Sequence, residues 1–175
     1  MHWIAFGILL YLTTVLQTTV APALAVHGVR PDLLSIVAAY YALTARKEDA
    51  LIACWFIGLA ADLTGLGYAR HCGLGASALA MGVISIAVVA VREVTFRESV
   101  VTQLIFSFVI SFCFALLTGI CLYISATNRP PGWDVVQSGF YGAVYTAVIA
   151  PYCQWGLRKV RNMLGLPVTR RVRMD

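Results

Sequence analysis

The stretch Gly58-Leu-Ala-Ala-Asp-Leu-Thr-Gly65 places a carboxylate, Asp62, at the end of a segment that otherwise has the composition of a membrane span. The apolar run begins at Ala50 and carries no charged residue before Asp62. On a helix, Asp62 shares a face with Gly58 and Gly65. A carboxylate facing hydrocarbon would cost about 2.5–3.5 kcal/mol at mid-span. The sequence therefore predicts that Asp62 points toward protein, inside a bundle of helices.

The composition of the whole chain supports a membrane environment. Of 175 residues, 60% are hydrophobic and only 12% are charged, against about 25% charged in an ordinary soluble domain. The net charge of +5 does not indicate nucleic-acid binding, because no basic stripe with interleaved aromatic residues is present. Basic residues instead flank the apolar segments, as in the cytoplasmic loops of membrane proteins.

The apolar segments predict an all-α integral membrane protein, with one membrane domain over residues 1–160 and a basic cytoplasmic tail over residues 161–175. A crossing helix needs about 20 apolar residues. Six candidate spans are visible, at about residues 3–26, 31–45, 50–66, 73–91, 100–126 and 135–157.

The second of these segments leaves the span count open. It is short, so it either crosses as a short or tilted helix or dips in and returns, and a five-span bundle would move one terminus across the membrane. Lys and Arg favour six spans, with ten on the inner side and three on the outer side. We therefore expect a multi-pass protein with both termini in the cytoplasm. We also expect the first segment to be retained, because no Lys or Arg precedes it.

Small residues recur at helical spacing in several spans, where they let helix backbones approach closely. The longest such stripe lies on the fifth span. It either packs inside the bundle or stays open as a face for a partner helix. Its residues are Gln103, Ser107, Ser111, Ala115 and Gly119.

Two further polar residues are expected at the height of Asp62. Gln17 lies in the outward half of the first span, and Asp32 follows Pro31 at the start of the second. Pro at the first helical position and an acidic residue next to it suit a helix N-terminus. Gln17, Asp32 and Asp62 are therefore predicted to converge in one polar patch. Each also has a purely structural alternative: an interhelical hydrogen bond for Gln17, a helix start for Asp32 and a loop cap for Asp62.

No constellation typical of catalysis is present. The sequence has no HExxH, GxSxG or P-loop motif, and no carboxylate cluster spaced to hold Mg²⁺. The five cysteines form no CxxC pair. We predict a protein that is not an enzyme and has no cofactor or metal.

The order of several motifs resembles the MreD family of bacterial rod shape-determining membrane proteins along nearly the whole chain. The motifs are Leu16-Gln17, Arg30-Pro31-Asp32-Leu33-Leu34, Gly58-Leu-Ala-Ala-Asp62-Leu, Gly73-Leu-Gly-Ala-Ser-Ala-Leu79, Pro151 and Arg158-Lys-Val-Arg161. The loop between Asp62 and Gly73 is longer than the usual turn of the family, with residues 67–72 added. Family roles are therefore carried over only to Gln17, Pro31, Asp32, Gly58, Asp62 and Gly75.

The resemblance implies a non-catalytic scaffold of the cell-elongation machinery in the bacterial cytoplasmic membrane. Such a protein would bind an MreC-like single-span partner and act indirectly with a RodA-type wall synthase and an MreB-like filament in lateral peptidoglycan synthesis. The family fold also resembles the substrate-binding subunits of vitamin-uptake transporters, so small-molecule capture, with Trp133 and Tyr123 as candidates, is the alternative function. A lipid-processing enzyme or flippase is a third hypothesis.

Overall fold

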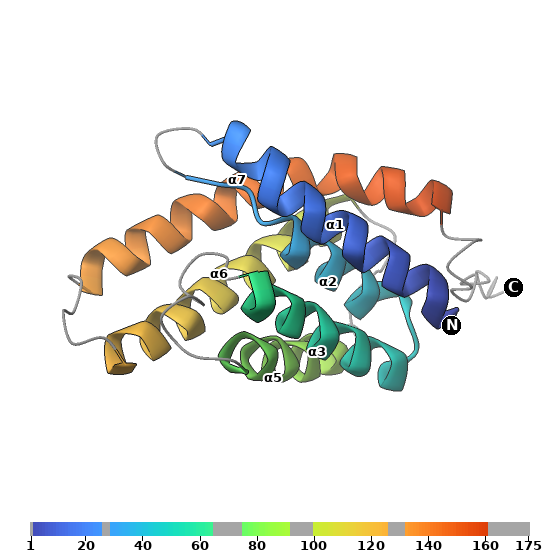
Figure 1. Cartoon of the computed structure of the whole chain (residues 1–175), viewed down its shortest axis with the longest axis horizontal. Helices are drawn as coiled ribbons and strands as arrows, with labels where there is room; N and C mark the ends of the chain where they lie inside the picture. Colours follow the sequence, from blue (N-terminus) through green and yellow to red (C-terminus); the bar gives the residue numbers. More distant parts are fainter. Residues whose placement is uncertain (1, 26–28, 65–74, 92–99, 126–131, 161–175) are drawn as a thin grey trace, which may run out of the picture.

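The computed structural model describes residues 2–25, 29–64, 75–91, 100–125 and 132–160 as a bundle of helices (Figure 1). The basic tail and the loop at 67–72 lie outside these residues. So do Arg70, Arg92, Arg97 and Arg129, four of the basic residues used to predict the topology. The helices are α1 (Trp3–Ala23), α2 (Leu33–Thr44), α3 (Lys47–Thr64), α5 (Ala76–Val91), α6 (Val100–Ser125) and α7 (Gly132–Val160).

The helices coincide with the predicted apolar segments, but two of them begin earlier. α3 includes Glu48 and Asp49 in its first turn, and α7 includes Asp134. Acidic groups in a first turn are stabilised by the positive end of the helix dipole, so these charged residues extend the helices rather than end them. Both α1 and the stretch Thr102–Cys121 of α6 are long and apolar enough to cross a membrane, whereas α2 and α5 are apolar but shorter.

The short helix α2 forms the centre of the bundle. All ten residues 34–43 are buried, and α2 contacts α1, α3, α5, α6 and α7. It runs antiparallel to α1, since Leu33 at its start bonds to Gln17 and Tyr41 near its end packs on Phe6. The segment is thus one uninterrupted helix, and it does not turn back on itself.

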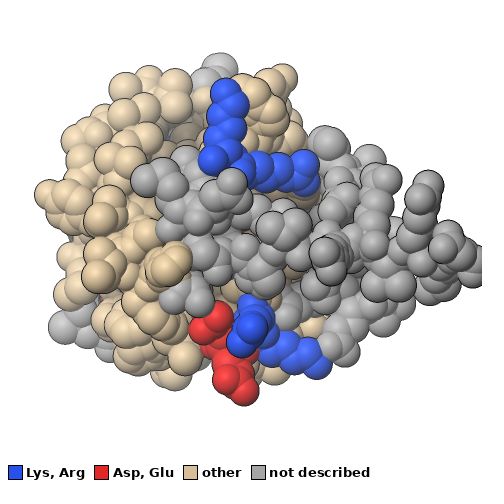
Figure 2. Space-filling view, turned by 90° about the vertical axis from the view of Figure 1, so that its right-hand side faces the viewer, with Lys and Arg blue, Asp and Glu red and all other residues tan. Residues whose placement is uncertain are grey.

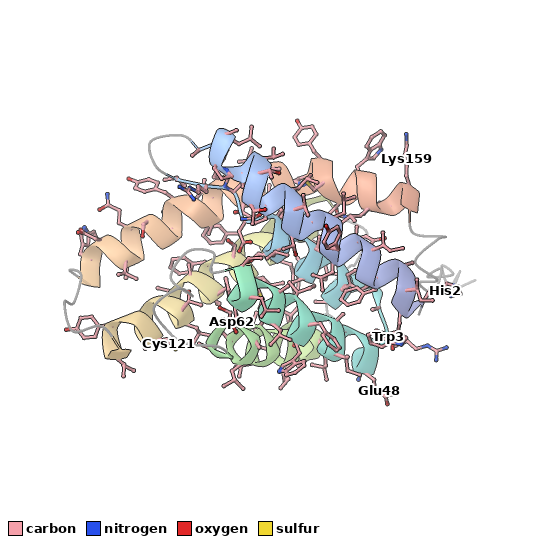
Figure 3. The ribbon with its side chains drawn as sticks, viewed as in Figure 1. His2, Trp3, Glu48, Asp62, Cys121 and Lys159 are labelled. Atoms are coloured by element: carbon pink, nitrogen blue, oxygen red, sulfur yellow. The ribbon has the colours of Figure 1, made fainter. Side chains whose placement is uncertain are left out.

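Around α2, the remaining helices form two closely packed pairs, α3 with α5 and α6 with α7, while α1 packs mainly on α2 and α3. The carbonyl oxygen of Leu24, the C-cap of α1, also accepts a hydrogen bond from the hydroxyl of Tyr145 in α7 at 2.8 Å. The start of α1, the start of α3 and the end of α7 lie at one end of the bundle, where His2, Glu48 and Lys159 are labelled in Figure 3. This arrangement places α3 and α5 side by side, and their junction positions Asp62.

Candidate functional site

Asp62, in the last turn of α3, caps the N-terminus of α5. Its Oδ2 accepts hydrogen bonds from the backbone N–H groups of Gly75 at 2.9 Å and Ala78 at 3.2 Å, and its Oδ1 accepts one from Ser77 at 3.1 Å. The residue before α5 is Gly75, with φ of +105°, a conformation that favours glycine. Because glycine has no side chain to cap its own helix, Asp62 supplies the acceptor from the neighbouring helix, where the helix dipole also favours a negative charge.

Gly58 allows this cap to form by bringing α3 against the backbone of α5. A Cβ at position 58 would lie 2.5 Å from the carbonyl oxygen of Ser77 and 2.7 Å from the Cα of Ala78. Gly58 and Asp62 are one helical turn apart on the same face, and both are buried. Together they fix the distance and the register between α3 and α5.

Gln17 joins α1 to the start of α2. Its Nε2 donates to the carbonyl oxygen of Pro31 at 3.0 Å, and its Oε1 accepts from the N–H of Leu33 at 2.7 Å. The N–H of Leu33 lies in the first turn of α2, where it has no intrahelical partner, and the carbonyl group of Pro31 lies before the N-cap. The Gln17 side chain is 7% exposed, so the two bonds replace water at this junction.

Asp32 is the N-cap of α2, and its Oδ1 accepts a hydrogen bond from the N–H of Ser35 at 3.2 Å. The hydroxyl of Ser35 donates to its Oδ2. The backbone N–H of Asp32 donates to Oγ1 of Thr146 in α7 at 3.0 Å. Pro31 therefore stands one residue before the cap, and the prediction that it occupies the first helical position is wrong, because the helix begins at Leu33.

The predicted polar patch is divided into two clusters. Gln17, Pro31 and Asp32 lie together where α1, α2 and α7 meet. Gly58, Asp62 and Gly75 lie together where α3 meets α5. The hydrogen bonds of Asp62 given above all go to the start of α5, and none reaches Gln17 or Asp32. In each cluster a carboxylate caps the start of a helix, Asp32 that of α2 and Asp62 that of α5.

The small-residue stripe of α6 packs inside the bundle, under α7. Gln103, Ser107 and Ser111 are buried, and Oγ of Ser107 accepts a hydrogen bond from Nε2 of Gln154 at 3.0 Å. A Cβ at Gly119 would overlap Cγ1 of Val135 in α7, and one at Gly139 would lie 3.1 Å from Cβ of Ala115. Of the two alternatives for this stripe, the structure shows internal packing, so the stripe is not an open face for a partner.

Two polar residues of this interior were missed in the sequence, Thr146 and Gln154 of α7. Both are almost fully buried, at 0% and 1% exposed. Gln154 could have been found by the reasoning that identified Asp62, since it is a polar side chain in an apolar segment. Thr146 had no such signal, because a threonine commonly bonds to its own helix, as Thr146 also does to Gly142.

An open groove of about 320 Å³ runs along the outside of the α3–α5 pair. It is lined by Leu51, Ile52, Trp55, Gly82, Ser85 and Ile86. The groove is mainly apolar, and the hydroxyl of Ser85 donates to the carbonyl oxygen of Gly82 at 2.7 Å. We name it the α3–α5 groove.

Charged side chains gather at the end of the bundle where α3 begins. Figure 2, which faces this end, shows Lys and Arg in two groups, with Asp and Glu beside one of them. Arg46, Lys47, Arg158 and Lys159 belong to this end, and Arg30 is the only other Lys or Arg within the described residues. The described residues hold no group of three His, Cys, Asp or Glu side chains that could bind a metal ion.

Comparison with known proteins identifies one family. The family described as rod shape-determining protein MreD matches residues 1–153, which include every helix up to the last turns of α7. No match was found among curated proteins or among solved structures. The likeness to vitamin-transporter subunits therefore stays a prediction.

Proposed function

Because the chain belongs to the MreD family of rod shape-determining membrane proteins, we propose that it is a non-catalytic scaffold of the bacterial cell-elongation machinery. In this role it binds an MreC-like single-span partner. Through that partner it acts with a RodA-type wall synthase and an MreB-like filament, and it supports lateral peptidoglycan synthesis and rod shape.

The observation that favours a scaffold is the engagement of Asp62. A catalytic carboxylate needs an oxygen within hydrogen-bond reach of its substrate. Both oxygens of Asp62 accept backbone N–H groups of α5 instead, and the side chain is 8% exposed. This carboxylate therefore serves to hold two helices in register, a function suited to a protein that presents a surface.

The proposal places the protein in the cytoplasmic membrane, with six spans and both termini in the cytoplasm. Four of the five described Lys and Arg residues lie at one end of the bundle, and such a bias marks the cytoplasmic side. Alkaline phosphatase, which is active only outside the cytoplasm, tests this when fused after residue 175. The fusion is expected to be inactive. An active fusion would place the C-terminus outside the cytoplasm and so contradict the proposed orientation.

Partner binding is tested by co-expressing the chain with the MreC-like protein of the same bacterium and purifying the chain through a tag. The partner is expected to copurify with the wild type and less with Asp62→Asn or Gly58→Leu, because both variants move α5. Asp134→Asn and Gly142→Leu are the matched controls, since Asp134 is exposed and a Cβ at Gly142 meets no atom within 4 Å. Wild-type protein that retains no partner would overturn the proposal.

The transporter alternative predicts saturable vitamin binding by the purified protein. Its candidate residues do not line the α3–α5 groove, and Trp133 is 72% exposed. An exposed Trp next to the start of α7 is simply explained as an anchor at the membrane interface. Saturable binding of a vitamin would replace the scaffold proposal with the transporter alternative.

A further inference from the structure

The α3–α5 groove is an open hollow on the lipid-facing side of the helix pair. Exposed apolar side chains alone do not mark a binding site in a membrane protein, because lipid is as apolar as they are. Helices associate in lipid through close packing, which small residues permit. Gly82 lies in the groove, and a Cβ added to it would contact only Trp55, at 3.9 Å. A neighbouring helix can therefore approach the backbone of α5 here.

The position of Trp55 is not that of a tryptophan that anchors a helix at the membrane surface. Of the other three tryptophans, Trp3 and Trp133 lie in the first turn of their helices, and Trp155 lies within the last two turns of α7. Trp55 lies eight residues after the start of α3, about 12 Å along the helix axis, near its middle. It is 44% exposed and forms one wall of the groove. Tryptophan is among the residues that contribute most to protein–protein binding energy.

Acidic side chains stand at one end of the same groove. Glu48 and Asp49 lie in the first turn of α3, directly after Arg46 and Lys47. Glu48 precedes Leu51, the first residue of the groove, by three residues, or about 4.5 Å along the axis. Both belong to the end of the bundle that is otherwise basic among the described residues. A helix lying in the groove would bring its flanking residues onto this acidic turn.

These features favour a partner helix that carries basic residues on its cytoplasmic flank. The basic end of the bundle is the cytoplasmic end in the proposed topology. A single-span protein carries its Lys and Arg on the cytoplasmic flank of its span. Such a flank complements Glu48 and Asp49, and the adjoining span would fill the groove above them. A second copy related by two-fold symmetry would place its own Glu48 and Asp49 against the same acidic pair, so it fits less well.

We propose that the α3–α5 groove is the docking site for the transmembrane helix of the single-span partner, with the basic cytoplasmic flank of that helix paired to Glu48 and Asp49. This inference rests on the proposed function and assigns its binding surface. It also gives Asp62 and Gly58 a role in binding: they set the spacing of α3 and α5, and so the width of the groove.

Photo-crosslinking in intact membranes tests the location without requiring a variant to keep its affinity. A benzophenone amino acid at position 86 is expected to crosslink to the MreC-like protein co-expressed from the same bacterium. The matched control is position 148 in α7, because Val148 is 58% exposed and Ile86 is 61% exposed. Crosslinking to the partner from position 148 but not from 86 would overturn the assignment. A crosslink from position 86 only to a second copy of the chain would do the same.

Two substitutions test the contacts by copurification. Gly82→Leu fills the groove and is expected to lower apparent partner affinity about tenfold, whereas Gly142→Leu is expected to leave it unchanged. Glu48→Lys is expected to lower it about threefold, an effect that weakens at high salt, and Asp134→Lys is its control at the start of another helix. A Lys→Glu change in the partner's flank should restore binding to Glu48→Lys.

The outcomes separate this inference from the proposed function. If the wild type retains the partner and Gly82→Leu and Glu48→Lys retain it equally well, the groove assignment is wrong and the scaffold role stands. If the wild type retains no partner, the scaffold role itself fails.

Discussion

The backbone of Gly58 lies directly against the carbonyl oxygen of Ser77, so closely that a Cβ at position 58 would stand 2.5 Å from it. One helical turn further along α3, Asp62 accepts the N–H of the same Ser77. The α3–α5 junction thus combines a steric requirement with a capping bond on adjacent turns. Changes at these two positions should have separable effects.

Gly58→Ala is expected to destabilise the protein by about 1–3 kcal/mol, because the new methyl group meets backbone atoms of α5 that cannot rotate away. The same change at Gly142, where a Cβ meets no atom within 4 Å, should stay within about 1 kcal/mol of wild type. Reversible unfolding in mixed detergent and lipid micelles measures both. Equal stability of the two variants would show that α3 and α5 do not approach as described.

Asp62→Ala is expected to cost about 0.5–2 kcal/mol, the usual range for loss of an N-cap acceptor. Asp62→Asn should cost less, because its amide keeps one accepting oxygen while losing the charge that the helix dipole favours. Hydrogen exchange adds a local measure. The amides of Ser77 and Ala78 should lose protection in Asp62→Ala before those at the middle of α5, and unchanged protection would exclude the cap.

Gln17→Leu should destabilise by about 1–3 kcal/mol, because it leaves the carbonyl of Pro31 and the N–H of Leu33 without a partner in a buried position. The same substitution at Gln137, an exposed residue of α7, is the control and should be close to neutral. Thermal unfolding followed by circular dichroism compares the two. A neutral Gln17→Leu would mean that the junction between α1 and α2 is held by apolar packing alone.

The hydrogen bond between Gln154 and Ser107 can be measured by a double-mutant cycle with Gln154→Leu and Ser107→Ala. A coupling energy of about 0.6–1.7 kcal/mol is expected, the range found for interhelical bonds in membranes. The cycle compares the unfolding free energies of the wild type, the two single variants and the double variant. Additive single effects would indicate that α6 and α7 associate through small-residue packing without a contribution from this bond.

The sequence predicted the helices well because apolar length and charged flanks are local features. It identified Gly58 and Asp62 as one face of α3, and they do lie together. It could not identify the partner of that face, because a carboxylate that caps a distant helix and one that caps its own loop have the same local pattern. The difference depends on Gly75 adopting a positive φ thirteen residues later.

The clustering of polar residues was harder to predict than their burial. Gln17, Asp32 and Asp62 were expected to meet because all three were placed at one height in the membrane. A shared height gives only the position of a residue along the membrane normal. Which side chains meet also depends on where each helix lies around α2. The α6 stripe shows the same limit, since a row of small residues predicts close packing but not whether the neighbour is α7 or another protein.

The central helix α2 has a consequence for biogenesis. At 12 residues it is about 18 Å long, short of the roughly 30 Å hydrocarbon layer, and its residues 34–43 are buried on every side. A helix of this kind has no stable independent state in the bilayer while the chain is being synthesised. We therefore expect α2 to leave the translocon together with the helices that pack against it. The order of insertion would then depend on contacts between helices as well as on the hydrophobicity of each segment.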